Sequence, residues 1–91
     1  METRSAFATS LETQLRQQGA DARVQLDGDR RDVLHIEWQN VHRSNIYGLV
    51  TSSAAQHALH MGFTSFVFSS GNQRWEYDLT RESMIRSSVQ P

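Results

Sequence analysis

The sequence predicts an α+β domain in which two helices pack on one face of a four-stranded sheet, in the order α-β-β-α-β-β, while the other sheet face stays open and polar. Two segments place apolar residues three or four positions apart, as on one side of a helix. Four short segments alternate apolar and polar residues, as half-buried strands do. The length of 91 residues suffices for one domain and leaves no room for two.

Each predicted helix has a single apolar stripe and ends at a glycine. In the first helix, predicted over residues 2–18, apolar residues recur at every fourth position from Phe7 to Leu15. The second helix is predicted over residues 44–61. Gly48 lies inside this helix, where glycine is less favourable than alanine by roughly 1 kcal/mol. We therefore expect the second helix to approach the sheet or the first helix closely at Gly48.

Four strands are predicted at residues 22–27, 33–38, 63–69 and 74–79, the first two joined by a hairpin loop. Each strand has one apolar side and one polar side, whereas a doubly wound sheet needs strands that are apolar on both sides. We expect Trp38 and Trp75 to be largely buried on the same side. The inward set is Ala22, Val24, Leu26, Leu34, Ile36, Trp38, Phe66, Phe68, Trp75, Tyr77 and Leu79.

These elements place a single domain at residues 1–79, followed by a polar C-terminal tail at residues 80–91. The tail contains only Met84, Ile85 and Val89 as sizeable apolar residues. We expect it to be frayed or loosely docked.

Composition argues against several classes of partner. All nine basic side chains are Arg, and ten acidic ones leave a formal net charge of −1, so the chain lacks the positive field of nucleic-acid-binding proteins. The strand aromatics belong to the inward set, which leaves none on the open face for stacking on bases. No apolar run is long enough for a transmembrane helix or a secretory signal. We expect no nucleic-acid partner, no insertion of this chain into a membrane, and a soluble domain either inside or outside the cytoplasm.

Two histidines, His57 and His60, are three residues apart on the second predicted helix, so their side chains could converge on a metal ion. No Cys exists in the chain, and no acidic residue lies between Asn40 and Arg74 to supply a third ligand. Two ligands do not make a closed site. We expect no metal and no cofactor, with His57 at the edge of the buried stripe and His60 in solvent.

An acid–base pair is conceivable on the open sheet face, where His35 and Glu37 are two residues apart and Arg23 or Arg74 lies across from them. A flat surface does not exclude water, and catalytic electrostatics depend on water exclusion. Cross-strand charge pairing explains these residues better. We therefore expect no catalytic residues and no enzymatic activity.

Four segments carry a resemblance that covers roughly residues 5–79. The chain resembles small bacterial domains of unassigned function that often follow a membrane anchor or lipoprotein signal, and its topology is similar to that of BON-like periplasmic domains, although it lacks their Gly-x-Val rhythm. The resemblance implies an α-β-β-α-β-β fold, an anchor upstream, and binding of partners or lipid without chemistry. The segments are Leu34-His35-Ile36-Glu37-Trp38, His60-Met61-Gly62-Phe63, Phe66-Val67-Phe68 and Trp75-Glu76-Tyr77-Asp78-Leu79.

The sequence thus favours a non-catalytic module that acts through contact with a protein whose identity the residues do not reveal. The alternatives are a small-ligand or lipid-binding domain with a cleft between the two helices, and a metal-binding or catalytic protein built on His57 and His60. A homodimer is also expected, because an open sheet leaves two unpaired edges and no lysine or interior proline protects them. Leu59, Tyr47 and the tail residues Met84 and Ile85 are apolar residues that a monomer core does not need. Charges in the strands, such as Arg23, Glu37 and Arg74, could instead protect the edges and keep the chain monomeric.

Overall fold

The computed structural model describes residues 3–89 of the chain, and side chains for residues 3–82. Within residues 3–89 it confirms the α+β class, with three helices and five strands in the order α-β-β-α-α-β-β-β. The elements are α1 (Arg4–Gln17), β1 (Ala22–Asp27), β2 (Val33–Trp38), α2 (Arg43–Val50), α3 (Ser53–His60), β3 (Ser65–Ser70), β4 (Gln73–Asp78) and β5 (Ser83–Val89).

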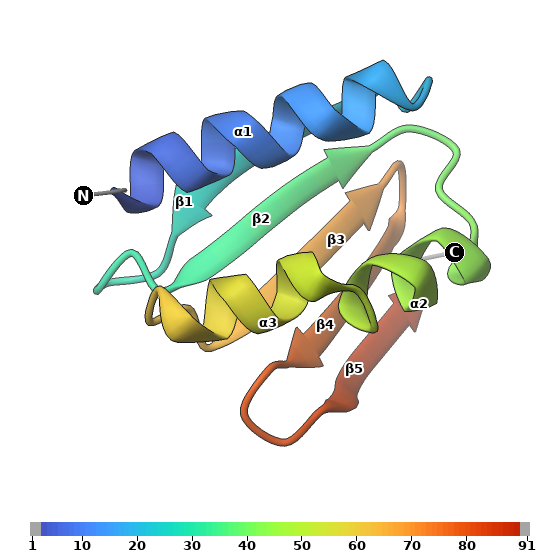
Figure 1. Cartoon of the computed structure of the whole chain (residues 1–91). Helices are drawn as coiled ribbons and strands as arrows, with labels where there is room; N and C mark the ends of the chain where they lie inside the picture. Colours follow the sequence, from blue (N-terminus) through green and yellow to red (C-terminus); the bar gives the residue numbers. More distant parts are fainter. Residues whose placement is uncertain (1–2, 90–91) are drawn as a thin grey trace.

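The strands form one mixed sheet in the order β1-β2-β3-β4-β5. Only the β2–β3 pair is parallel, because α2 and α3 carry the chain back across the sheet between these two strands. The other three pairs are antiparallel and need only short loops. Figure 1 shows α1 over the β1–β2 side and α2–α3 over the β3–β4 side, all on one face of the sheet.

The single helix predicted over residues 44–61 is in fact two helices, with a break at Thr51 and Ser52. The Thr51 hydroxyl donates to the carbonyl of Tyr47 at 2.7 Å, and the Ser52 hydroxyl donates to the carbonyl of Leu49 at 2.5 Å. Ser and Thr hydroxyls offer the backbone an alternative to continued helical bonding, and two in succession end α2 here, with α3 beginning after Ser52. The apolar spacing continues through the break, so periodicity alone did not reveal it.

The prediction of four strands followed by a polar tail misses a fifth strand. Residues 83–89 pair antiparallel with β4, from Asp78 opposite Ser83 to Gln73 opposite Val89, with an irregularity between Glu76 and Tyr77. The segment has no regular alternation of apolar and polar residues, and the bulge interrupts whatever alternation it has. The sheet therefore extends beyond the region that the strand pattern indicated.

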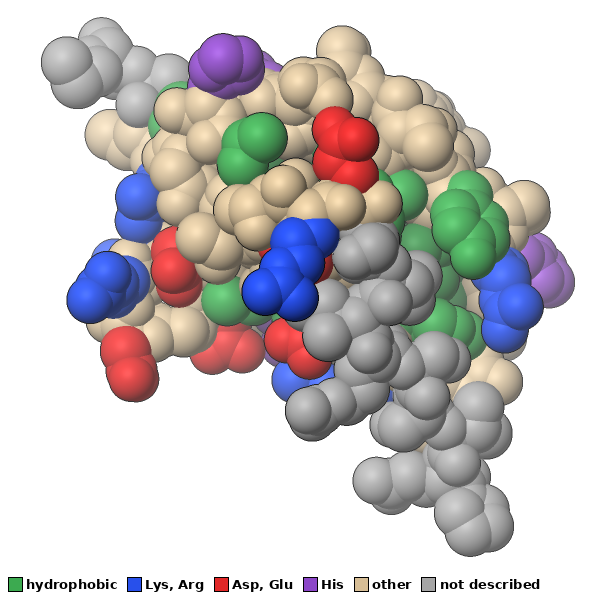
Figure 2. Space-filling model, turned by 90° about the horizontal axis from the view of Figure 1, so that it is seen from below, with side chains coloured by type: hydrophobic (Ala, Val, Ile, Leu, Met, Phe, Trp, Pro, Cys, Tyr) green, Lys and Arg blue, Asp and Glu red, His purple; other side chains and the backbone are tan. Residues whose placement is uncertain are grey.

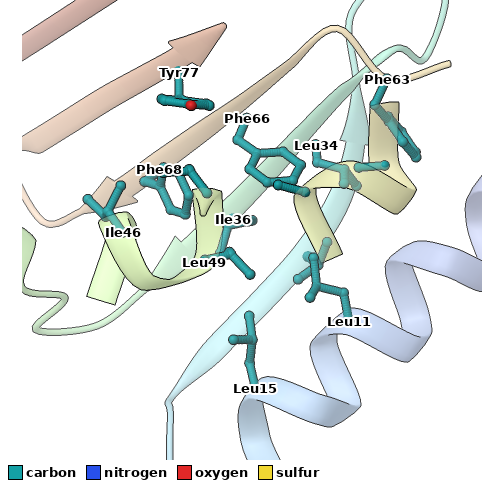
Figure 3. Close-up of a cluster of buried hydrophobic side chains, with 14 of the residues drawn as sticks. Leu11, Leu15, Leu34, Ile36, Ile46, Leu49, Phe63, Phe66, Phe68 and Tyr77 are labelled. Carbon is teal, nitrogen blue, oxygen red and sulfur yellow. The ribbon is translucent and has the colours of Figure 1, made fainter. Parts of the chain in front are cut away.

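The core lies between the helices and the inward side of the sheet. Figure 3 shows Leu11 and Leu15 extending from α1, and Ile46 and Leu49 from α2, toward the phenylalanines of β3. Burial confirms the inward set except at Leu26 and Trp38, which are only partly buried. Trp75, the other tryptophan of the set, is buried, at 7% exposure. Val67, on the opposite side of β3, is also buried, at 3% exposure.

The outer edge of β1 is covered by side chains of α1. The backbone N–H of Val24 donates to the Glu12 carboxylate at 2.9 Å, and the Arg16 guanidinium donates to the carbonyl of Ala22 at 3.0 Å. Glu12 and Arg16 are four residues apart and therefore share one face of the helix. Two backbone groups of an edge strand thus have partners without a further strand, which bears on the expected dimer.

Candidate functional site

A groove runs between α1 on one side and α2–α3 on the other. It consists of two adjoining hollows of about 530 and 460 Å³, which share Leu11, Gln14, Ser53 and Ala54 as lining residues. Both volumes lie in the range of small-molecule sites. The groove is the cleft between the helices that the ligand-binding alternative requires.

The larger hollow joins apolar side chains with neutral polar ones. Leu15 and Leu49 face it from opposite helices, and the half-buried Trp38 at the end of β2 contributes an indole ring. None of the residues lining this hollow has an ionisable side chain. Its polar side chains are all amides or hydroxyls: Gln14, Gln18, Ser44, Asn45, Ser52 and Ser53.

Gly48 lines the larger hollow from the middle of α2. A Cβ added there would meet no heavy atom within 4 Å, so the expected close approach of α2 to another element is wrong. A glycine within a helix is destabilising by about 0.5–1 kcal/mol relative to alanine, and no packing constraint requires it here. Because Gly48 has no side chain, the groove remains open at this position.

The second hollow is bounded by an aromatic contact between α1 and α3. The rings of Phe7 and His57 meet edge to face with centroids 5.0 Å apart, and Phe7 also packs on Phe63 at 5.7 Å. His57 and His60 are both exposed, and His57 contacts the buried Phe7 at the margin of the apolar stripe. Within residues 3–89 no three His, Cys, Asp or Glu side chains are grouped so as to hold a metal ion.

On the opposite face of the sheet, His35 pairs with residues other than Glu37. Its Nε2 lies 2.9 Å from the Ser69 hydroxyl, and its Nδ1 lies 3.8 Å from the Asp27 carboxylate. Glu37 is exposed and sits opposite Arg23 on β1 and beside Ser69 on β3. The structure thus places Asp27 and Ser69, and not Glu37, beside the His35 ring, and it places Arg23 across from Glu37 as cross-strand pairing requires.

Sequence reasoning missed Ser69 because it is 34 residues from His35 and only the parallel β2–β3 pairing brings them together. Its position on the open side of β3 was predicted, but the strand order was not. No local signal in the sequence identifies such a pair, since serine is abundant in this chain.

Charges are mixed on the surface. On the face seen in Figure 2, Arg side chains lie among Asp and Glu side chains, and the described residues there form no patch of one sign. Among residues 3–82, two large apolar side chains are exposed, Tyr47 on α2 at 48% and Leu59 on α3 at 38%.

Comparison with family models, with curated proteins and with solved structures finds no match to this chain. Among the helices of the described chain, none has both the length and the apolar character needed to cross a bilayer. Inferences about function therefore rest on the geometry of the groove and of the open sheet face.

Proposed function

We propose that this domain is a binding module whose groove between α1 and α2–α3 receives a small, uncharged organic ligand bearing hydroxyl or amide groups. The observation that carries the proposal is Gly48, which keeps the groove open at a cost in helix stability that no packing contact explains. Binding sites commonly retain such locally unfavourable residues.

The lining chemistry supports the choice of ligand. The amide side chains of Gln14, Gln18 and Asn45 donate and accept hydrogen bonds, and the serine hydroxyls do the same. A charged ligand would lose hydration without finding an opposite charge in the larger hollow. The indole of Trp38 and the leucines offer an apolar surface for the rest of the molecule.

Binding without chemistry is proposed for the groove itself. Its only titratable side chain among the lining residues is His57, which lies in the smaller hollow with its ring against Phe7. General acid–base work needs a titratable group within hydrogen-bond reach of the reacting atoms. A lone histidine at one end leaves the larger hollow without such a group.

The proposal is tested by titrating the protein with neutral saccharides and with N-acetyl amino-acid amides, following the change in tryptophan emission that binding beside Trp38 produces. Fatty acids and phosphatidylcholine vesicles form a second arm. Saturable binding of a neutral hydroxyl- or amide-bearing compound, lost in Gly48→Leu and kept in Gln56→Leu, is expected. Gln56 is exposed on α3 and lines neither hollow, so it is a matched control for added bulk.

Binding of fatty acid or vesicles alone would contradict the proposed ligand chemistry. If Gly48→Leu binds the neutral compound with the same affinity as the parent, the compound does not bind in the groove. Should Gly48→Leu fail to fold, Gly48→Ala provides a milder change. It is expected to raise the free energy of unfolding by about 0.5–1 kcal/mol and to weaken binding at the same time.

A second function is favoured by the exposed side chains of Tyr47 and Leu59, which offer apolar contact area to a protein partner. We propose contact with a protein as a role compatible with ligand binding. The double variant Tyr47→Ser/Leu59→Ser is expected to weaken self-association measured by sedimentation velocity. Unchanged self-association of the double variant would show that Tyr47 and Leu59 do not lie in the interface.

A further inference from the structure

We propose that Ser69 is a nucleophilic serine, activated by His35 and Asp27, that accepts the acyl group of a neutral activated ester. The site lies on the sheet face opposite the groove and is independent of the ligand proposed there. Three side chains from three adjacent strands, β1, β2 and β3, form it.

The two ring nitrogens of His35 have different partners. Nε2 is 2.9 Å from the Ser69 Oγ, within the distance at which a general base removes a hydroxyl proton. Nδ1 is on the side of Asp27, with the carboxylate oxygen 3.8 Å away. A carboxylate on one side of an imidazole and a hydroxyl on the other is the order in which serine nucleophiles are activated.

The fold holds this arrangement on paired strands. Gln25 and His35 are opposite each other in the β1–β2 ladder, and His35 and Val67 in the β2–β3 ladder, so the backbone beneath the cluster is fixed by bonds on both sides. Sites built on strands are held more closely than sites on loops. The reacting pair therefore needs no loop movement to meet.

The surroundings are partly shielded from water. The His35 side chain is 24% exposed, Ser69 is half-buried and Val67 beside them is buried, whereas the Asp27 side chain is 58% exposed and remains in contact with solvent. Arg74 is opposite Ser69 in the β3–β4 ladder and therefore on the same face of the sheet, so its guanidinium is the cation proposed to interact with a developing oxyanion. Glu37 adjoins Ser69 from β2, which disfavours an acidic substrate and points to a neutral ester.

The proposed step is acyl transfer to the serine. Ser69 Oγ attacks the ester carbonyl carbon, and its proton passes to His35 Nε2. The new Oγ–C bond forms, the bond from that carbon to the leaving oxygen breaks, and the leaving group takes the electron pair and then the proton from His35. The charged imidazole is stabilised by the Asp27 carboxylate while it carries the proton.

Release of the acyl group is expected to be slow. β3 lies between β2 and β4, so its backbone N–H groups are engaged in the sheet and cannot form a paired oxyanion site. The side chain of Arg74 is exposed and stabilises the oxyanion less than buried donors do. We therefore expect acylation of Ser69 to outpace hydrolysis of the acyl-enzyme.

The experiment mixes the full chain with p-nitrophenyl acetate and measures p-nitrophenolate release, with the acetylated residue located by peptide mass spectrometry. A burst of about one equivalent per chain and acetylation at Ser69 are expected. His35→Gln keeps a side-chain N–H donor but cannot accept the proton, so the burst rate should fall by about 100-fold or more. Ser65→Ala, on the same strand and the same face, should leave the burst unchanged.

Thermal melts of each variant separate loss of reactivity from loss of fold. Acetylation confined to histidines, a burst that survives Ser69→Ala, or equal burst rates in His35→Gln and the parent would each overturn the proposal. Gln56→Leu, at an exposed position of α3 that lines neither hollow, should leave the burst unchanged, because the reactive serine lies on the other face of the sheet.

Discussion

Arg4 joins three segments that are distant in sequence. Its Nε donates to the carbonyl of Met61 at 3.1 Å, its Nη1 donates to the carbonyl of Arg30 at 3.0 Å, and its guanidinium carbon lies 5.6 Å from the ring centroid of Phe63. The first turn of α1 is thereby fixed to the β1–β2 loop and to the connection between α3 and β3. The guanidinium also occupies the space where a side chain at position 62 would go, which favours Gly62 there.

We predict that Arg4→Ala lowers the free energy of unfolding by about 1–3 kcal/mol, because its charge-assisted hydrogen bonds to the carbonyls of Met61, Arg30 and Arg31 and its contact with the Phe63 ring are lost. Arg4→Lys should be nearly as damaging, since an ammonium group cannot reach these carbonyls in the geometry of a guanidinium. Arg23→Ala, at an exposed position of β1, is the control and should stay within about 0.5 kcal/mol of the parent in urea unfolding. Equal stability of the Arg4 and Arg23 variants would contradict the assigned role.

The turn between β4 and β5 depends on Asp78. The Thr80 hydroxyl donates a hydrogen bond to the Asp78 carboxylate at 2.6 Å, and the Thr80 backbone N–H donates another at 2.8 Å. The hydrogen bond from the hydroxyl is the main reason that the pKa of Asp78 lies below its ordinary value. A lowered pKa means that the ionised form stabilises the fold above the ordinary carboxyl pKa of about 3.9, and that this contribution is lost as the pH falls through the lower folded value.

Asp78→Asn is therefore predicted to be less stable than the parent at pH 6. The difference in free energy of unfolding between the two proteins should become smaller as the pH is lowered below about 3.9. Asp29→Asn, in the exposed β1–β2 loop, is the control and should show no such trend. Urea unfolding at a series of pH values measures both. A gap for Asp78→Asn that widens toward low pH would contradict the assignment.

The two tryptophans differ in burial, which modifies the expectation that both are largely buried. Trp75 is 7% exposed within the core, whereas Trp38 is half-buried at the margin of the groove. We predict that Trp75→Ala lowers the free energy of unfolding by about 3–5 kcal/mol and that Trp38→Ala lowers it less. Thermal denaturation checks the order, and a Trp75→Ala variant that melts within a few degrees of the parent would contradict it.

At the scale of single elements, α1 both forms one wall of the groove and covers the edge of β1. Glu12 and Arg16 hold the backbone groups of Val24 and Ala22 that would otherwise face an incoming strand. We predict that Glu12→Ala/Arg16→Ala increases concentration-dependent association in sedimentation velocity, because the β1 edge becomes available for pairing. Thr13→Ala/Gln17→Ala, exposed positions of the same helix, should not. If both double variants associate equally, the covering of the edge has no protective effect.

The whole molecule has one edge covered by α1 and a second edge formed by β5. The predicted homodimer is accordingly proposed to combine strand addition at β5, which would continue the sheet, with contact through the exposed side chains of Tyr47 and Leu59. Light scattering coupled to gel filtration at tens of micromolar should then give about twice the 10.4 kDa chain mass. A mass near that of one chain across the concentration range would contradict the dimer.

Much of the fold can be predicted from local pattern. The alternation in residues 33–38 and 74–79 and the fourfold spacing from Phe7 to Leu15 each reflect a window of a few residues, and each appears as expected. A local pattern cannot distinguish two structures that have the same spacing of apolar residues, such as one long helix and two shorter ones. The break at Thr51 leaves the helical spacing of apolar residues intact, and β5 lacks a regular alternation to detect.

The candidate sites depend on relations between elements that no window contains. The sequence allowed a cleft between the helices as one alternative. Only the packing of the helices shows that Gly48 lines this cleft and does not lie against a neighbouring element. His35 and Glu37 share a strand face and looked like a pair, yet the parallel β2–β3 pairing brings Ser69 to the His35 ring instead.

The sequence by itself determined the class of this protein, the sides of its first four strands and the composition of its core, because hydrophobic periodicity is a property of neighbouring residues. The tertiary structure decided which faces meet: the wall that α1 makes with α2–α3, the cover over β1, and the approach of Asp27, His35 and Ser69. The physical reason is that strand order and helix placement follow from burying all the apolar faces at once.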